Sequence, residues 1–173
     1  EFNQAVKTWL ETSCYRDMQE VGSGDFDGAL ALEIISAIAT EEDPVLPKIA
    51  KKVRSDSRVV TRYLTAFESL FIIHKLKPHS LGIGKPQFIL CDSGIAQHLG
   101  ASDEKQIQIH VLNEALANFE RAGIQKPLIE YYRNQKSARI PLIFRWINKK
   151  QSPESMIVKL VDSESVSGHD INT

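Results

Sequence analysis

The sequence has few cysteines and no long apolar run. Cys14 and Cys91 lie far apart among 173 residues, without a Cys-x-x-Cys pair or a neighbouring histidine cluster. A structural zinc site takes closely spaced Cys and His ligands, so we expect no zinc. Two ordinary thiols are typical of a reduced, cytoplasmic protein. No apolar run approaches the roughly 20 residues that span a bilayer, so we expect no membrane partner.

The sequence also lacks the motifs of common nucleotide-dependent and metal-dependent enzymes. Gly82-Ile83-Gly84-Lys85 resembles the end of a phosphate-binding loop, but Pro86 replaces the Ser or Thr that binds magnesium. His79 stands where the first glycine of that motif belongs. Gly22-Ser23-Gly24 lacks the third glycine of a dinucleotide-binding turn, and the histidines have no ligand spacing. We therefore expect no cofactor, no metal and no ATP hydrolysis by P-loop chemistry.

Positive charge is concentrated in one stretch of the chain. Residues 47–85 contain nine Lys or Arg and two acids, a charge of +7, whereas the whole chain carries −1. The remaining 134 residues therefore carry −8, from 12 basic and 20 acidic residues. Such an asymmetry indicates a surface that binds a polyanion.

The same stretch has the pattern of a helix-turn-helix. Leu46, Ile49, Ala50 and Val53 form one apolar face of a short helix. Asp43 before Pro44 is predicted to cap that helix, with the proline at its first position. Residues 54–57 are polar and of the right length for the turn, and Asp56 or Ser57 is expected to cap a second helix over 57–70.

The second helix and a following hairpin carry the predicted binding residues. Residues 71–76 and 87–91 are predicted strands around a Pro/Gly-rich loop, which is the arrangement of a wing. In such a module the second helix contacts base edges and its basic neighbours contact phosphates. The predicted nucleic-acid contacts lie on both elements and just before them: Lys51, Lys52, Arg54, Arg58, Thr61, Arg62, Lys75, Lys77, His79 and Lys85.

The flanking segments predict an α+β protein in two parts. Helices are expected over 2–21 and 26–40, and a short helix over 95–99. The polar residues 101–105 are the expected boundary between a part at 1–100, the helical lead-in and winged helix-turn-helix, and a part at 101–173. The second part is expected to hold a long helix over 106–122, then strands over 128–132, 140–147 and 156–161, and a frayed tail.

Motifs spread from Trp9 to Lys159 resemble the C-terminal domain of unknown function that follows the ATPase core in bacterial and archaeal AAA-type ATP-binding proteins. They are Trp9-Leu10-Glu11-Thr12, Tyr15-Arg16-Asp17, Val59-Val60-Thr61-Arg62-Tyr63-Leu64, Glu68-Ser69-Leu70-Phe71, and Lys85-Pro86-Gln87-Phe88-Ile89-Leu90-Cys91-Asp92-Ser93-Gly94-Ile95. The resemblance implies an AAA-type ATPase domain in the same polypeptide. The chain begins at Glu1 and not at methionine, and we expect a fragment of a longer protein.

The second half of that family is similar to the PD-(D/E)xK nuclease fold. The resemblance places Glu114 at the helix acid, Lys159 at the final lysine, and Tyr131-Tyr132-Arg133 at the aromatic strand. Pro141 and Ile157 stand where the family has its metal-binding Asp and Glu. Nuclease chemistry needs two or three carboxylates around a divalent cation, so the unit is expected to be a degenerate, non-enzymatic one with vestigial Glu114 and Lys159.

The sequence therefore predicts a non-enzymatic DNA-binding or docking module. One alternative is a protein-interaction module whose basic face binds an acidic partner. Another is a residual metal-dependent nuclease that uses other acids, namely Glu130, Glu154 or Asp162. A stand-alone transcription regulator is a further possibility.

Overall fold

We analysed a computed structural model of the chain, which describes residues 8, 9, 12, 16–21, 25–124, 126–136, 138–148 and 151–160. The elements are α2 (Met18–Val21), α3 (Gly28–Thr40), α4 (Leu46–Lys52), α5 (Ser57–Ser69), β1 (Ile73–Pro78), β2 (Gln87–Leu90), α6 (Ser93–His98), α7 (Asp103–Arg121), β3 (Leu128–Arg133), β4 (Arg139–Ile147) and β5 (Pro153–Val158). The protein is therefore α+β, as the sequence predicts. Most of the helix expected over 2–21 lies outside the described residues.

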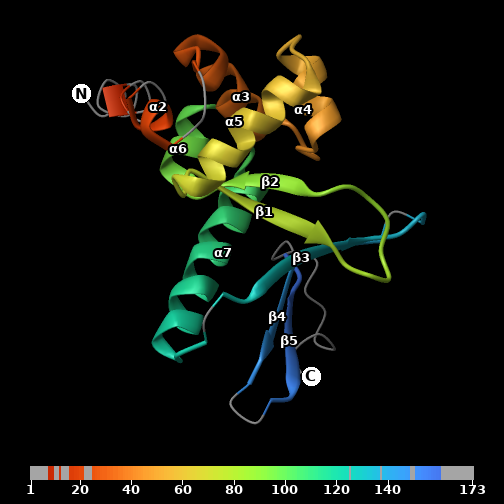
Figure 1. The fold of residues 1–173 in the computed structure, drawn as a ribbon. Helices are drawn as coiled ribbons and strands as arrows, with labels where there is room; N and C mark the ends of the chain where they lie inside the picture. Colours follow the sequence, from red (N-terminus) through yellow and green to blue (C-terminus); the bar gives the residue numbers. More distant parts are fainter. Residues whose placement is uncertain are drawn as a thin grey trace.

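The strands form one mixed sheet in the order β2-β1-β3-β4-β5 (Figure 1). β1 and β2 make an antiparallel hairpin, and β3, β4 and β5 pair antiparallel in turn. A short parallel pairing of β1 with β3, Lys77 opposite Glu130 and Pro78 opposite Tyr131, joins the two groups. The sheet thus crosses the boundary expected at residues 101–105, and the division into 1–100 and 101–173 stays a prediction.

Helices α3, α4 and α5 pack with the hairpin around a continuous apolar core. Their buried side chains include Ile34, Ile38, Ile49 and Phe67, which meet Ile73 and Leu90 of the hairpin. α7 covers β4, where the Phe119 ring lies 5.3 Å from Phe144 and 4.8 Å from Trp146 between centroids. Figure 1 shows α7 extending from the helical group alongside the strands of the second half.

Local capping explains where several helices begin. Asp27 accepts hydrogen bonds from the amides of Ala29 and Leu30 at the start of α3. Asp56 accepts from the amide of Arg58 at the start of α5, and Asp92 accepts from the amide of Ile95 at the start of α6. Ser102 caps α7, which begins at Asp103, so residues 103–105 belong to this helix and not to a polar joint.

The prediction that Asp43 caps α4 is wrong. Val45 is the N-cap residue and makes no side-chain capping bond. The Asp43 carboxylate instead accepts from Arg133 Nη1 at 2.6 Å and from the buried Gln87 Nε2 at 3.2 Å. A charge-assisted hydrogen bond to Arg133 is stronger than a bond to a helix amide, so the Asp43 carboxylate binds this arginine and does not cap α4.

Two buried charges connect the winged-helix elements with the second half. Asp43 joins the α3–α4 linker to β3, and Lys105 of α7 donates to the carbonyls of Ile38 and Glu41 at the end of α3. Burial lowers the pKa of Lys105 to about 8, although the nearby Glu41 carboxylate opposes the shift. The last carbonyls of an α-helix have no hydrogen-bond donor within the helix, so the Lys105 ammonium supplies donors to these groups at the end of α3.

Candidate nucleic-acid interface

The helix-turn-helix presents one exposed face of α5. α4 ends at Lys52, and Arg54 takes a positive φ of 52° in the turn before α5. Val60, Tyr63, Leu64 and Phe67 point into the core. The residues between them, Arg58, Thr61, Arg62 and Thr65, are exposed along α5, in the pattern expected from a 3.6-residue period.

Six of the predicted contact residues are exposed cations that make no ion pair within the described part of the chain. Three lie on or beside the helix-turn-helix and three on the hairpin: Lys51, Arg54, Arg58, Lys75, Lys77 and Lys85. Because none of the described acids pairs with them, their charges are available to an external anion. We call these six side chains the cationic face.

Two other predicted contacts are already engaged inside the protein. Lys52 Nζ lies 3.0 Å from Glu41 Oε1 and 2.8 Å from Thr40 Oγ1. Arg62 donates to the carbonyl of Asp25 at 2.9 Å, and its guanidinium lies 5.0 Å from the centroid of the Phe26 ring. Lys52 therefore ties α4 to the end of α3, and Arg62 holds the segment that leads into α3.

The two uncharged predicted contacts have partial local partners. The Thr61 hydroxyl donates to the carbonyl of Ser57 at 2.7 Å, so its oxygen can still accept a hydrogen bond, and the residue is exposed. His79 Nδ1 accepts from the Leu81 amide at 3.2 Å, and its ring meets Tyr132 edge-on at 6.4 Å. His79 therefore shapes the loop of the wing.

A groove of about 270 Å³ runs between the exposed face of α5 and the base of the wing. Thr61 and Thr65 of α5 face Lys75 and Lys85 of the hairpin across it, and Glu68 lies at one end. The full lining is Leu46, Pro47, Thr61, Leu64, Thr65, Glu68, Lys75, Lys85, Pro86 and Phe88. The structure thus brings the second helix and the wing together, and it adds Pro47 and Glu68, which the charge pattern did not single out.

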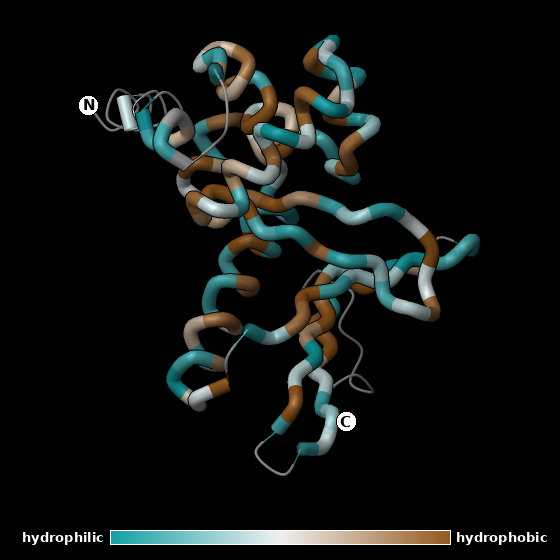
Figure 2. Tube along the Cα trace, in the orientation of Figure 1, coloured by the Kyte–Doolittle hydropathy of each residue, from teal (hydrophilic) through white to brown (hydrophobic). Residues whose placement is uncertain are grey.

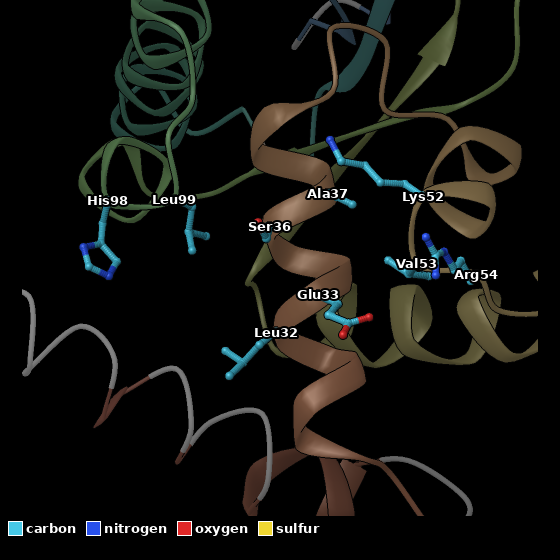
Figure 3. A pocket seen from close by; sticks show the side chains of 9 residues that line it. All are labelled: Leu32, Glu33, Ser36, Ala37, Lys52, Val53, Arg54, His98 and Leu99. Atoms are coloured by element: carbon cyan, nitrogen blue, oxygen red, sulfur yellow. The ribbon is translucent and has the colours of Figure 1, made fainter.

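A second cavity, of about 640 Å³, lies between α3, α4 and α6. Figure 3 shows the α3 side chains in the middle, with His98 and Leu99 on one side of α3 and Lys52, Val53 and Arg54 on the other. The lining residues are Leu32, Glu33, Ser36, Ala37, Lys52, Val53, Arg54, His98 and Leu99. Lys52 extends along this cavity toward the end of α3, in keeping with its bonds to Thr40 and Glu41.

The positions that the nuclease resemblance picks out do not form a metal site. Glu114 is exposed on α7 and is not among the side chains that this helix buries. Pro141 accepts from Gln108 Nε2 through its carbonyl, Ile157 pairs with Ile143, and Lys159 is exposed beyond β5. Within the described ranges no group of three or more Asp, Glu, His or Cys side chains is placed to hold a metal ion.

The acids that a residual nuclease would use are either hydrogen-bonded to neighbouring side chains or lie outside the described residues. Arg145 donates to both oxygens of Glu130, at 2.5 and 2.8 Å, and Glu130 is only 3% exposed. Glu154 accepts from Asn148 Nδ2 at 2.7 Å, whereas Asp162 is not among the described residues.

Cys91 is half-buried, and burial raises the pKa of its thiol to about 12, so this sulfur is not a reactive thiolate.

The order α3-α4-α5-β1-β2, with an antiparallel hairpin after the second helix of a helix-turn-helix, defines a winged helix. Among solved structures, the chain is similar to the crystal structure of transcriptional regulator PA3341. The two are 18% identical, and the similarity covers 68% of this chain and 92% of that one with a TM-score of 0.33. The assignment as a winged helix rests on the order and pairing of the elements.

Searches against protein-family models and against curated proteins give no match. No helix in the described part of the chain is long and apolar enough to cross a membrane.

Proposed function

We propose that this chain binds DNA through the exposed face of α5 and the wing. The observation that carries the proposal is the groove between the second helix and the wing base, which Lys75 and Lys85 line. The other four members of the cationic face are, like these two, exposed and unpaired within the described residues. Duplex DNA carries one negative charge per about 1.7 Å of helix axis, and an α-helix fits its major groove.

The residues of the face take different roles in this proposal. Arg58 and Thr61 lie in the first turns of α5, where a recognition helix contacts base edges. Lys75 and Lys85 line the groove with Thr61, and we assign them, together with Lys51, Arg54 and Lys77, to phosphate contacts. Lys52 and Arg62 act indirectly, since their bonds to Glu41 and Asp25 position the helices that support the face. His79 positions the wing loop.

The resemblance of residues 9–159 supports a second part of the proposal, that the module belongs to an AAA-type ATPase polypeptide. In that setting the winged helix docks the ATPase onto nucleic acid, and the α7–β5 unit is a non-catalytic scaffold. The positions of Pro141 and Ile157 on paired strands, where acids would have to converge, support the absence of nuclease activity.

The principal rival is a protein-interaction module whose basic face binds an acidic protein surface. Lysine footprinting in the presence of a random duplex of about 25 base pairs distinguishes the two. Acetic anhydride modification, followed by mass spectrometry, is expected to show protection by DNA of the four face lysines, Lys51, Lys75, Lys77 and Lys85. Lys126 and Lys159, which are exposed elsewhere, serve as internal controls. Equal modification of all six lysines with and without DNA would favour the rival.

A further inference from the structure

The tip of the wing is apolar, although cations stand on both sides of it. Leu81 is 81% exposed and Ile83 is 48% exposed, and both lie between Lys77 and Lys85. Figure 2 shows hydrophobic segments at the outer end of the loop that joins β1 and β2. A single exposed leucine is ordinary on a protein surface, so its meaning depends on how the loop holds it.

The loop is anchored to β3. The amide of His79 donates to the carbonyl of Tyr131 at 2.8 Å, and the amide of Ile83 donates to the carbonyl of Arg133 at 2.9 Å. The Tyr131 hydroxyl donates to the carbonyl of Lys85 at 2.8 Å on the return side. The wing loop is thus attached to the central strand of the sheet before, within and after its apolar tip.

A glycine makes this attachment possible. Gly84 has a φ of +139°, and a Cβ atom at this position would lie 2.1 Å from the Tyr131 hydroxyl oxygen. The Tyr131 ring therefore occupies the space beside Gly84 that any other residue would need. The return side of the loop therefore packs closely on Tyr131, while Leu81, three residues earlier, stays exposed.

We propose that Leu81, supported by Ile83, enters the minor groove as a wedge between two base pairs and bends the duplex. The inference rests on the proposed function and assigns the wing tip a part in it. Apolar side chains inserted in this way unstack one base step at a cost of a few kcal/mol, which the added protein contact on bent DNA repays. Lys77 and Lys85 bind the phosphates on either side of the opened step.

The position of the wedge agrees with the placement of α5. The wing base and α5 line the same groove, Lys75 and Lys85 from the hairpin and Thr61 and Thr65 from α5, so one duplex can contact both elements. With α5 in the major groove, the wing reaches the adjacent minor groove. Pyrimidine–purine steps are the easiest to unstack, so the wedge favours sites with a TA or CA step under Leu81.

Energy transfer between dyes at the two ends of a duplex of about 25 base pairs with a central TA step measures the bend, and anisotropy of the same duplex measures binding. Wild-type protein is expected to raise the transfer efficiency. Leu81→Ser is expected to abolish that rise and weaken binding about tenfold, because the apolar contact is lost. Phe71→Ser is the matched control, since Phe71 is 80% exposed but lies between α5 and the start of β1, at the opposite end of the hairpin from its tip, and it should behave as wild type.

The outcomes separate the wedge from DNA binding itself. Duplex binding without any rise in transfer, or a bend that Leu81→Ser leaves intact, would overturn the wedge and leave the proposed function standing. Absence of binding by the wild-type protein would remove both. Loss of the bend in Leu81→Ser alone, with Phe71→Ser unchanged, would establish the wedge.

Discussion

The double substitution Arg58→Glu/Lys77→Glu is expected to weaken binding to a random duplex by about a hundredfold or more at about 100 mM salt. Arg58 lies at the start of α5 and Lys77 lies on the wing strand, so the pair samples both halves of the cationic face. Each replacement removes an attraction to phosphate and adds a repulsion. Both side chains are exposed and unpaired in the described structure, so folding should be unaffected.

The matched control is Arg121→Glu/Lys159→Glu. It also reverses one arginine and one lysine, both of them exposed, at the end of α7 and beyond β5. Anisotropy titrations should show nearly wild-type affinity for this control, and thermal unfolding should show that both variants are folded. Equal losses of affinity in the two double variants would mean that net charge, and not this face, governs binding.

Asp43→Ala is expected to give the largest loss of stability, about 2–4 kcal/mol in the free energy of unfolding. Asp43 is only 9% exposed, and its carboxylate binds Arg133 of β3 and the buried Gln87 of β2. Removal of the carboxylate leaves the Gln87 amide without that acceptor inside the protein. The Arg133 side chain is about half exposed and regains water, which keeps the loss below that of a fully buried pair.

Urea unfolding of wild type and variant at several pH values measures this effect. Burial by itself raises the pKa of Asp43. The hydrogen bond and charge of Arg133, together with the charges of Arg139 and Lys48, lower it by more than burial raises it, so the net pKa lies below its ordinary value. The carboxylate therefore contributes stability above its unfolded pKa of about 4, and this contribution disappears as the pH falls through the folded pKa.

The difference between wild type and Asp43→Ala should accordingly shrink in acid. Lys48→Ala is the control, because Lys48 is half exposed and its nitrogen lies 3.5 Å from Asp43 Oδ2. Such a surface pair contributes about 0–1 kcal/mol. A loss at Lys48 as large as that at Asp43, or a difference that does not change with pH, would show that the buried ion pair is not the source of the stability.

The helix-turn-helix and its hairpin were predictable because their signals are local. The apolar spacing of Val60, Leu64 and Phe67 fixes the inward face of α5, and Asp56 caps it from the adjacent position. The strands of the second half also follow from short apolar segments. Bounds shift by a few residues, as at β1, where Phe71 has a positive φ of 56° and the strand begins only at Ile73.

The contacts between distant segments were not predictable in the same way. Asp43 before Pro44 has every local feature of a helix cap, yet its partner Arg133 lies 90 residues further along the chain. Arg62 has the spacing of a binding residue, but Asp25 and Phe26, about 37 positions earlier, engage its guanidinium. Charge counts identify which residues are basic, and only the folded arrangement shows which of them remain unpaired.

Anisotropy of a labelled random duplex of about 25 base pairs, titrated with wild-type protein from about 50 to 300 mM salt, tests the central claim most directly. If the six cations of the face each neutralise a phosphate, log K should fall against log salt with a slope of about −5. The account predicts tight binding at the lowest salt and that slope. Absence of binding at about 50 mM salt would contradict it, and the cationic face would then be a docking surface for an acidic protein.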